Sequence, residues 1–316
     1  MTSTTTAASI TRSASKQTYY TISFLIDRDL VADAYRAYAY FRWVDDTLDQ
    51  DGIGRTDRLE FVNRQAALME SCYRGDWPQD LTIEESMLAD LVRSDRGKAS
   101  GLQSYIRNMM AVMAFDADRR GRVITQSELA EYALGLATSV TEAMHYFIGH
   151  NYPSPRSEAR YLAATAAHIT HMLRDTYEDT AAGYYNIPRE VVALYGIHPG
   201  DITSEPYRAW VRQRVELARR YFQSGKEYLA QVENSRCRIA GYAYTARFEW
   251  VLDVIERDDY LLRANYAERK STGAVLQMAW SALSMAVGYQ RQPAPAGAWL
   301  PDKKPITVQG SHHRQQ

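Results

Sequence analysis

The sequence predicts an all-α protein that folds as one domain around a central set of helices. Nearly every segment between the two ends has apolar residues three and four positions apart, which is the spacing of an amphipathic helix. No run of alternating, β-branched residues indicates a strand. Two segments, residues 30–50 and 157–180, are rich in alanine and nearly apolar on several sides, so we expect other helices to surround them.

The predicted helices follow one another along the chain with short breaks between them. Residues 58–75 repeat the helical spacing and end in glycine, which is a frequent helix stop. The other predicted helices are residues 30–50, 85–94, 101–121, 125–150, 157–180, 207–232, 235–266 and 273–290. Breaks that contain glycine, proline or both fall at residues 51–55, 75–80, 150–157, 186–190, 195–201 and 203–207.

We expect the two ends of the chain to lie outside a single domain that spans residues 15–290. Residues 1–14 are rich in serine, threonine and alanine and lack the apolar stretch of a secretory signal, so we expect a flexible N-terminal tail. Residues 291–316 contain four prolines and little periodicity, which predicts a flexible, proline-rich C-terminal tail.

The composition is that of an ordinary soluble protein. Of 316 residues, 46% are hydrophobic and 24% are charged, and the formal net charge of -1 gives no reason to expect nucleic-acid binding. Cys72 and Cys237 do not make a disulfide framework, and a reducing cytoplasm is the simpler interpretation. No run of 18 apolar residues predicts a membrane-spanning helix.

The first cluster of acidic residues ends the predicted helix at residues 30–50. Asp45 and Asp49 share one helix face at a spacing of four, and Asp46 lies beside them. The stretch before them is apolar except for Arg42, which lies one turn before Asp45, and Tyr38 lies one turn earlier still. Like charges at this spacing repel one another and destabilise a helix unless a cation lies between them.

The second cluster lies on the predicted helix at residues 157–180. His171, Asp175 and Asp179 follow one another at spacings of four, so they line one face, and Arg174 lies beside Asp175. A single pair of this kind is usually a solvated helix surface. Here there are two such pairs, and each lies at the end of an alanine-rich segment and beside an arginine. This combination favours one cation-binding site that the two pairs share.

Magnesium is the cation that suits these residues best. It takes oxygen ligands and often joins a few carboxylates to substrate phosphates. Two aspartate pairs on facing helices could hold two or three Mg²⁺ ions around a diphosphate, with arginines completing its neutralisation. The ions would then draw off the diphosphate as a leaving group and leave a carbocation behind.

At these two clusters the sequence resembles the squalene/phytoene synthase family of head-to-head prenyl synthases. "AYAYFRWVDDTLDQ", residues 37–50, is similar to the family's first aspartate-rich motif, and residues 168–190 are similar to its second. Residues 116–144 resemble its middle segment, and the resemblance covers about residues 15–270. It implies an isoprenoid synthase-type helical bundle around a central cavity.

The resemblance also implies roles for individual residues. Asp45, Asp49, Asp175 and Asp179 match the family's magnesium-binding aspartates. Further residues match catalytic or substrate-binding positions near the diphosphate, in the N-terminal flap segment and on the middle helix; these are Tyr38, Arg42, Arg174, Thr18, Tyr19 and Tyr132.

The chain departs from the family pattern around the second motif. His168 stands in place of a glutamine, and we expect it to line the prenyl pocket or to form a hydrogen bond inside the bundle. His171 stands in place of an asparagine, and it could bind a diphosphate oxygen or a metal-bound water, orient Asp175, ligate metal or pack in the core. Tyr184 and Asn186 occupy positions where the family has arginine and tyrosine.

Three functions stay open on the sequence alone. Head-to-head condensation of two prenyl diphosphates through a cyclopropyl intermediate is the function that the resemblance implies. A class I terpene synthase that cyclises one prenyl diphosphate is the main alternative. Without the family's arginine and tyrosine, the protein could have lost the second half of the reaction, in which the cyclopropyl intermediate is ionised and rearranges. A non-catalytic assembly or interaction protein fits less well, because all four aspartates are retained and buried carboxylates have no benefit without metal.

The expected partners follow from the same resemblance. We expect farnesyl or geranylgeranyl diphosphate as substrate class, Mg²⁺ as cofactor and no nucleic acid. No nucleotide-binding fingerprint is present, so NADPH is not predicted. We expect a cytoplasmic protein, and the sequence leaves open peripheral membrane contact and the choice between monomer and homodimer.

Overall fold

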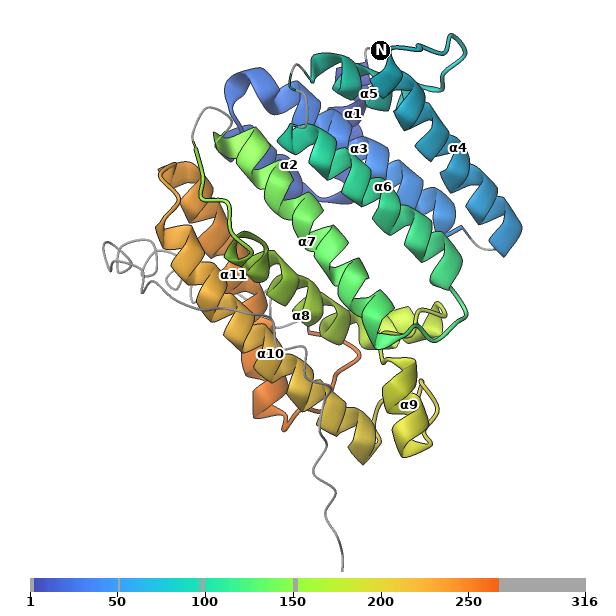
Figure 1. The fold of residues 1–316 in the computed structure, drawn as a ribbon, viewed down its shortest axis with the longest axis vertical. Coiled ribbons are helices and arrows are strands. Elements are labelled where there is room, and N and C mark those ends of the chain that lie inside the picture. The colour runs from blue at the N-terminus through green and yellow to red at the C-terminus, as the bar shows by residue number, and fades with distance from the viewer. Residues whose placement is uncertain (1–2, 51, 96, 98–99, 150–152, 267–316) are drawn as a thin grey trace, which may run out of the picture.

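The protein is a layered bundle of α-helices, seen here in a computed structural model (Figure 1). The structure describes residues 3–50, 52–95, 97, 100–149 and 153–266. Within these ranges there is no strand, and one isolated bridge joins Val123 to Tyr185. The prediction of an all-α protein is therefore confirmed. None of the described helices is both long and apolar enough to cross a bilayer.

The described helices fall into two groups that share α7. They are α1 (Ser3–Ala14), α2 (Lys16–Leu25), α3 (Val31–Leu48), α4 (Arg55–Arg74), α5 (Ile83–Ser94), α6 (Gly101–Arg119), α7 (Gln126–Gly149), α8 (Ala159–Ala181), α9 (Arg189–Tyr195), α10 (Glu205–Ala230) and α11 (Ser235–Arg257). Helix α3 packs against α1, α5 and α6, and helix α8 packs against α7, α10 and α11. Figure 1 shows α7 lying between the two groups.

The two alanine-rich helices, α3 and α8, hold the centres of these groups, as expected. Ala37, Ala39 and Tyr40 of α3 are almost fully buried. Small residues also let α8 and α10 approach closely, because a Cβ at Gly225 of α10 would lie 2.6 Å from the backbone nitrogen of Ala163. Any larger residue at position 225 would push the two helices apart.

The N-terminal segment corrects one prediction. Residues 1–14 were expected to be a flexible tail, but Ser3–Ala14 forms helix α1, which packs against α3 and α5. Ala7 and Thr11 are one turn apart and fully buried, and the Thr11 hydroxyl donates to the Ala7 carbonyl at 2.8 Å. Polar composition therefore misled the prediction, because small side chains with internal hydrogen bonds can pack as well as apolar ones.

The C-terminal end of α11 corrects a second prediction. A helix was expected to continue to residue 266, but α11 ends at Arg257. Asp259 and Tyr260 have φ values of 54° and 64°, a left-handed conformation that stops an α-helix. The predicted helix at residues 273–290 and the predicted tail at residues 291–316 lie outside the described residues.

Candidate active site

A pocket of about 260 Å³ lies where the C-terminal ends of α3 and α6 meet the N-terminal part of α7 and the C-terminal half of α8. Its lining residues are Asp45, Leu48, Asp49, Asp116, Arg119, Tyr132, His168, His171, Met172, Asp175, Asp179 and Tyr184. Both predicted aspartate pairs therefore line one pocket, although they are more than 120 residues apart in the sequence. Tyr132, His168 and His171 line it with them.

The larger pocket of about 660 Å³, near the N-terminal ends of α6 and α8, differs in its charge. Two acidic residues, Glu142 and Glu158, line it together with two arginines, Arg156 and Arg160. Glu142 accepts two hydrogen bonds from Arg160, at 2.8 and 3.1 Å, so the acidic and basic side chains of this pocket balance in number. The smaller pocket holds five aspartates, and it is therefore the better candidate for a site that binds cations.

The α3 pair carries unneutralised negative charge. Burial, together with the nearby Asp49 carboxylate, raises the pKa of Asp45 to about 6, although Arg42 opposes this shift. Arg42 lies 3.4 Å from Asp45 and forms a shorter ion pair with Asp46, so much of its charge is directed away from the pocket. Asp116 on α6 adds to the repulsion at Asp45.

The α8 pair is asymmetric. Burial would raise the pKa of Asp175, but hydrogen bonds from His171 at 2.8 Å and from Arg174 at 2.5 Å outweigh burial and lower that pKa well below its usual range. Burial raises the pKa of Asp179 to about 6, with the amide of Asn186 donating to it at 2.7 Å. The protein's own donors thus stabilise the Asp175 carboxylate, whereas burial destabilises the Asp179 carboxylate.

Helix α6 supplies a largely buried ion pair, Asp116 and Arg119, that was not among the predicted site residues. Asp116 accepts hydrogen bonds from Arg119 at 2.6 Å and from the Tyr132 hydroxyl at 3.0 Å. Arg119 also donates to Asn186 at 3.0 Å, and its guanidinium carbon lies 4.7 Å from the centre of the Tyr132 ring. Arg119 therefore links the α6 side of the pocket to the loop that follows α8.

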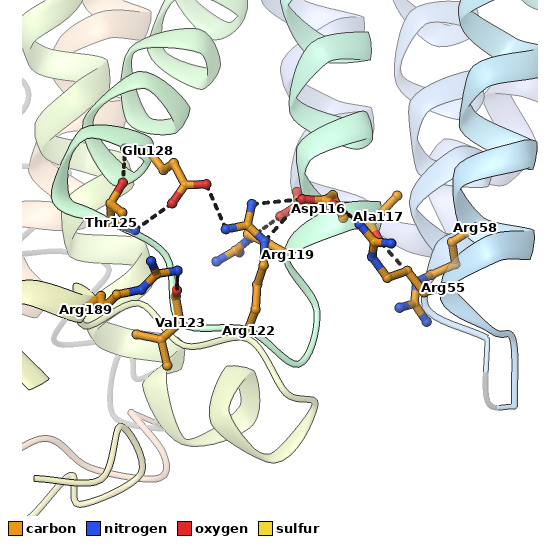
Figure 2. A network of polar contacts seen from close by, with 11 residues as sticks. Arg55, Arg58, Asp116, Ala117, Arg119, Arg122, Val123, Thr125, Glu128 and Arg189 are labelled. Carbon is orange, nitrogen blue, oxygen red and sulfur yellow. Dashed lines mark hydrogen bonds and ion pairs between the residues drawn. The ribbon is translucent and has the colours of Figure 1, made fainter.

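A signal for this pair existed in the sequence. Asp116 and Arg119 have the three-residue spacing of neighbours on one helix face. They lie at the start of residues 116–144, the segment that resembles the family's middle region. Figure 2 shows both residues at the end of α6, next to the loop that leads into α7.

The loop after α8 brings two of the departures from the family pattern to the pocket. Tyr184 donates to Asp49 at 3.1 Å, and Asn186 bonds both Asp179 and Arg119. Gly183, with φ of 87°, turns the chain at the start of this loop, and its carbonyl accepts from the Gly121 nitrogen at 2.8 Å. The two substituted positions therefore connect the α3 and α8 pairs.

Ion pairs and a hydrogen bond fix the loop between α6 and α7, which follows the pocket-lining residues Asp116 and Arg119 (Figure 2). Arg122 pairs with Asp118 at 2.9 Å and with Glu128 at 2.7 Å, and Arg189 donates to the Val123 carbonyl at 3.2 Å. These contacts, together with the Val123 to Tyr185 bridge, tie the two loops to each other. The lining residues are consequently held on well-anchored segments.

Thr18 and Tyr19, expected in a flap segment near substrate, do not line the pocket in the described part of the chain. The Thr18 nitrogen and hydroxyl both bond the Ser15 hydroxyl, at 3.1 and 2.9 Å, which caps the start of α2. The Tyr19 ring stacks on Tyr35, with 5.4 Å between ring centres. Their substrate-binding roles therefore stay predictions.

Tyr38, Arg42 and Arg174 also lie outside the lining of the pocket as described. Arg42 and Arg174 act on the site through the aspartates that they pair with. Tyr38 is partly buried against the apolar cluster around α3. These residues are placed to support the pocket, and their catalytic roles stay predictions.

The donor set fits a hard divalent cation in charge and ligand type. Among the described residues, no three His, Cys, Asp or Glu side chains are already arranged around a common metal position. Carboxylate oxygens are nevertheless the ligands that Mg²⁺ prefers. The raised pKa values of Asp45 and Asp179 mark uncompensated negative charge, and a divalent cation would remove that penalty.

The fold and the site define an all-α bundle of the isoprenoid synthase type, with two aspartate pairs on neighbouring walls of one pocket. The family model for squalene/phytoene synthase matches residues 11–274. The chain therefore belongs to the squalene/phytoene synthase family.

Individual relatives agree with this assignment. Phytoene synthase 1 of Arabidopsis thaliana is 24% identical over 272 residues, which cover 83% of this chain and 61% of that protein. Phytoene synthase of Daucus carota is 28% identical over 144 residues, or 43% of this chain and 34% of that protein. The chain thus spans only about a third to three fifths of the length of these two curated relatives.

Solved structures agree with the fold. A squalene synthase from Alicyclobacillus acidocaldarius superimposes with a TM-score of 0.64 at 19% identity, covering 83% of this chain and 95% of that one. A dehydrosqualene synthase in complex with ligand gives a TM-score of 0.66 at 17% identity, covering 89% and 95%. At these identities the likeness supports the helical fold alone.

Proposed function

We propose that this protein is a magnesium-dependent prenyl synthase that condenses two prenyl diphosphates head to head. One observation carries the proposal: the two aspartate pairs, from α3 and α8, line a single pocket. Membership of the squalene/phytoene synthase family supports the same reaction class. Asp45, Asp49, Asp175 and Asp179 would hold two or three Mg²⁺ ions, which supply Lewis-acid assistance to the departing diphosphate.

The remaining lining residues would bind and orient the substrate. Arg119 lies against the rings of Tyr132 and Tyr184, at 4.7 and 4.9 Å from their centres, so one cationic group and two π faces meet at one wall. The arginine is suited to a diphosphate oxygen. The rings are suited to a carbocation that forms after ionisation and is captured by the double bond of a second prenyl chain.

Cyclisation of a single prenyl diphosphate is the second candidate. The pocket volume of about 260 Å³ favours it, because pockets that hold ligands of moderate size usually measure about 300 to 1,000 Å³. Two prenyl chains would require the pocket to widen. Tyr184 and Asn186, in place of the family's arginine and tyrosine, are a further reason to keep this candidate.

The test is incubation of the protein with Mg²⁺ and geranyl, farnesyl or geranylgeranyl diphosphate, each with and without NADPH. Diphosphate release and the mass of the extracted organic product are measured. We expect a C30 or C40 product that does not require NADPH. A cyclic C15 or C20 product would establish the second candidate. Absence of diphosphate release from every substrate would refute both and leave a non-catalytic interaction protein.

A further inference from the structure

His168 on α8 is a buried imidazole that faces the pocket. Its side chain is only 6% exposed and lines the pocket beside Tyr132 and Met172. Neither of its ring nitrogens has a hydrogen-bond partner among the described residues. A buried polar group without a partner destabilises a fold, so its retention in a pocket calls for a functional explanation.

A second buried histidine shows what a structural imidazole looks like in this protein. His145 on α7 bonds the Tyr228 hydroxyl through Nε2 at 3.1 Å, and its Nδ1 lies 3.7 Å from the Cys237 sulfur. It does not line the pocket as described. The two histidines therefore differ in their hydrogen bonding: the ring nitrogens of His145 have neighbours to bond, whereas His168 lines the pocket with two ring nitrogens that have no partner among the described residues.

The surroundings of His168 keep it unprotonated. Burial lowers its pKa well below 6.5, and His171 on its own helix, Arg119 on α6 and Arg214 on α10 lower it further. From α7, the Tyr132 ring meets it edge to face at 5.1 Å, while the Tyr132 hydroxyl is committed to Asp116. At neutral pH the imidazole thus retains a lone pair that no neighbouring side chain uses.

We propose that His168 accepts the proton whose loss ends the reaction, which rests on the proposed function. The C–H bond next to the cationic carbon breaks, its electron pair forms a C=C double bond, and the proton binds a ring nitrogen of His168. No reductant enters this balance, so the product is an alkene with a new double bond and not a reduced hydrocarbon. A weak base suffices, because a C–H bond beside a carbocation is a far stronger acid than an imidazolium ion.

The test compares His168→Gln and His168→Phe with wild type and with the matched control His145→Gln. Glutamine keeps hydrogen-bonding ability, phenylalanine keeps a flat ring, and neither accepts the proton. We expect the alkene formed per diphosphate released to fall about 100-fold, the lower end of the losses seen when a catalytic base is removed. The missing product should return as an alcohol from water capture or as an uncoupled prenyl alcohol. His145→Gln should leave the product distribution unchanged.

Each other outcome is decisive. An unchanged share of alkene in both His168 variants would overturn the proposal while leaving the proposed function intact. Loss of the helical circular dichroism spectrum in both variants would show a structural role and would overturn it as well. Failure of the wild type to release diphosphate is a different result, because it would refute the proposed function before His168 is tested.

Discussion

The two aspartate pairs of the pocket differ in how much of their charge the protein itself neutralises. Asp45 on α3 and Asp179 on α8 have pKa values raised to about 6, whereas the pKa of Asp175 is lowered by His171 and Arg174. The charged forms of Asp45 and Asp179 are destabilised until a cation arrives, whereas the charged form of Asp175 is stabilised in advance. The difference teaches that Asp175 is preorganised as a carboxylate, while Asp45 and Asp179 depend on the metal for their charge balance.

The largest expected effect is on turnover. Asp45→Ala and Asp175→Ala should each lower kcat at least about 10³-fold, because Lewis-acid stabilisation of a leaving group contributes several kcal/mol. Steady-state diphosphate release measures this effect. Asp46→Ala is the matched control, since Asp46 bonds Arg42 and lies outside the pocket lining as described. A wild-type rate in either pocket variant would place the metal site elsewhere.

Substitution of Asp175 and of Asp45 should change stability in opposite directions. Asp175→Asn should lower the free energy of unfolding by about 1 to 3 kcal/mol, because Arg174 and His171 lose their charged acceptor. Asp45→Asn should raise it by less than about 1 kcal/mol, because the Asp45 side chain is 44% exposed and solvent screens the relieved repulsion. Urea unfolding without divalent cations measures both. Equal losses in the two variants would remove the proposed difference.

The pH dependence should follow the raised pKa values. The folded-state pKa of Asp45 and Asp179, about 6, exceeds the ordinary 3.8, so folding takes up protons between these values. Their contribution therefore favours the folded state below about pH 4 and is lost as pH rises through 6. The free energy of unfolding of wild type, minus that of the double variant Asp45→Asn and Asp179→Asn, should fall between about pH 4 and about pH 6 without Mg²⁺. A flat difference would contradict the shifts.

The smallest effect is expected for His171→Asn, which restores the residue that the family has at this position. Loss of one hydrogen bond to Asp175 should cost about 1 kcal/mol of stability. Asp175 would then have one competitor fewer for the metal, so we expect half-maximal activity at a lower Mg²⁺ concentration. A titration of diphosphate release with Mg²⁺ tests this. Unchanged metal dependence and product would show that His171 is structural.

The regular features of the fold were predictable from local patterns. Helical spacing located α3, α6, α7, α8 and α10 nearly to their ends, because long amphipathic segments identify themselves without tertiary information. The N-terminal helix α1 was missed, since its stability depends on packing against α3 and α5 and not on its own composition. The end of α11 was missed because left-handed residues at 259 and 260 follow no clear sequence rule.

In the candidate site, too, local patterns predicted some features and tertiary packing decided the others. The aspartates were found because their four-residue spacing is a local property of one helix. The contacts between different elements were not found from the sequence, because they join distant residues. The hydrogen bond from Arg119 to Asn186 spans 67 positions, and the one from Tyr184 to Asp49 spans 135. The sequence marked Tyr184 and Asn186 only as departures from a pattern, and packing shows what they bond instead.

The central proposal is that the α3 and α8 pairs bind Mg²⁺ and diphosphate together, and ligand-induced stabilisation tests it most directly. Thermal unfolding is measured with Mg²⁺, with inorganic diphosphate, and with both, for wild type, Asp45→Ala, Asp175→Ala and Asp46→Ala. Ligands at about 100 times their Kd stabilise a protein by about 2.7 kcal/mol. We predict that only the combination stabilises wild type and Asp46→Ala to this degree, and that either pocket variant abolishes the shift. An undiminished shift in Asp45→Ala or in Asp175→Ala would contradict the shared site.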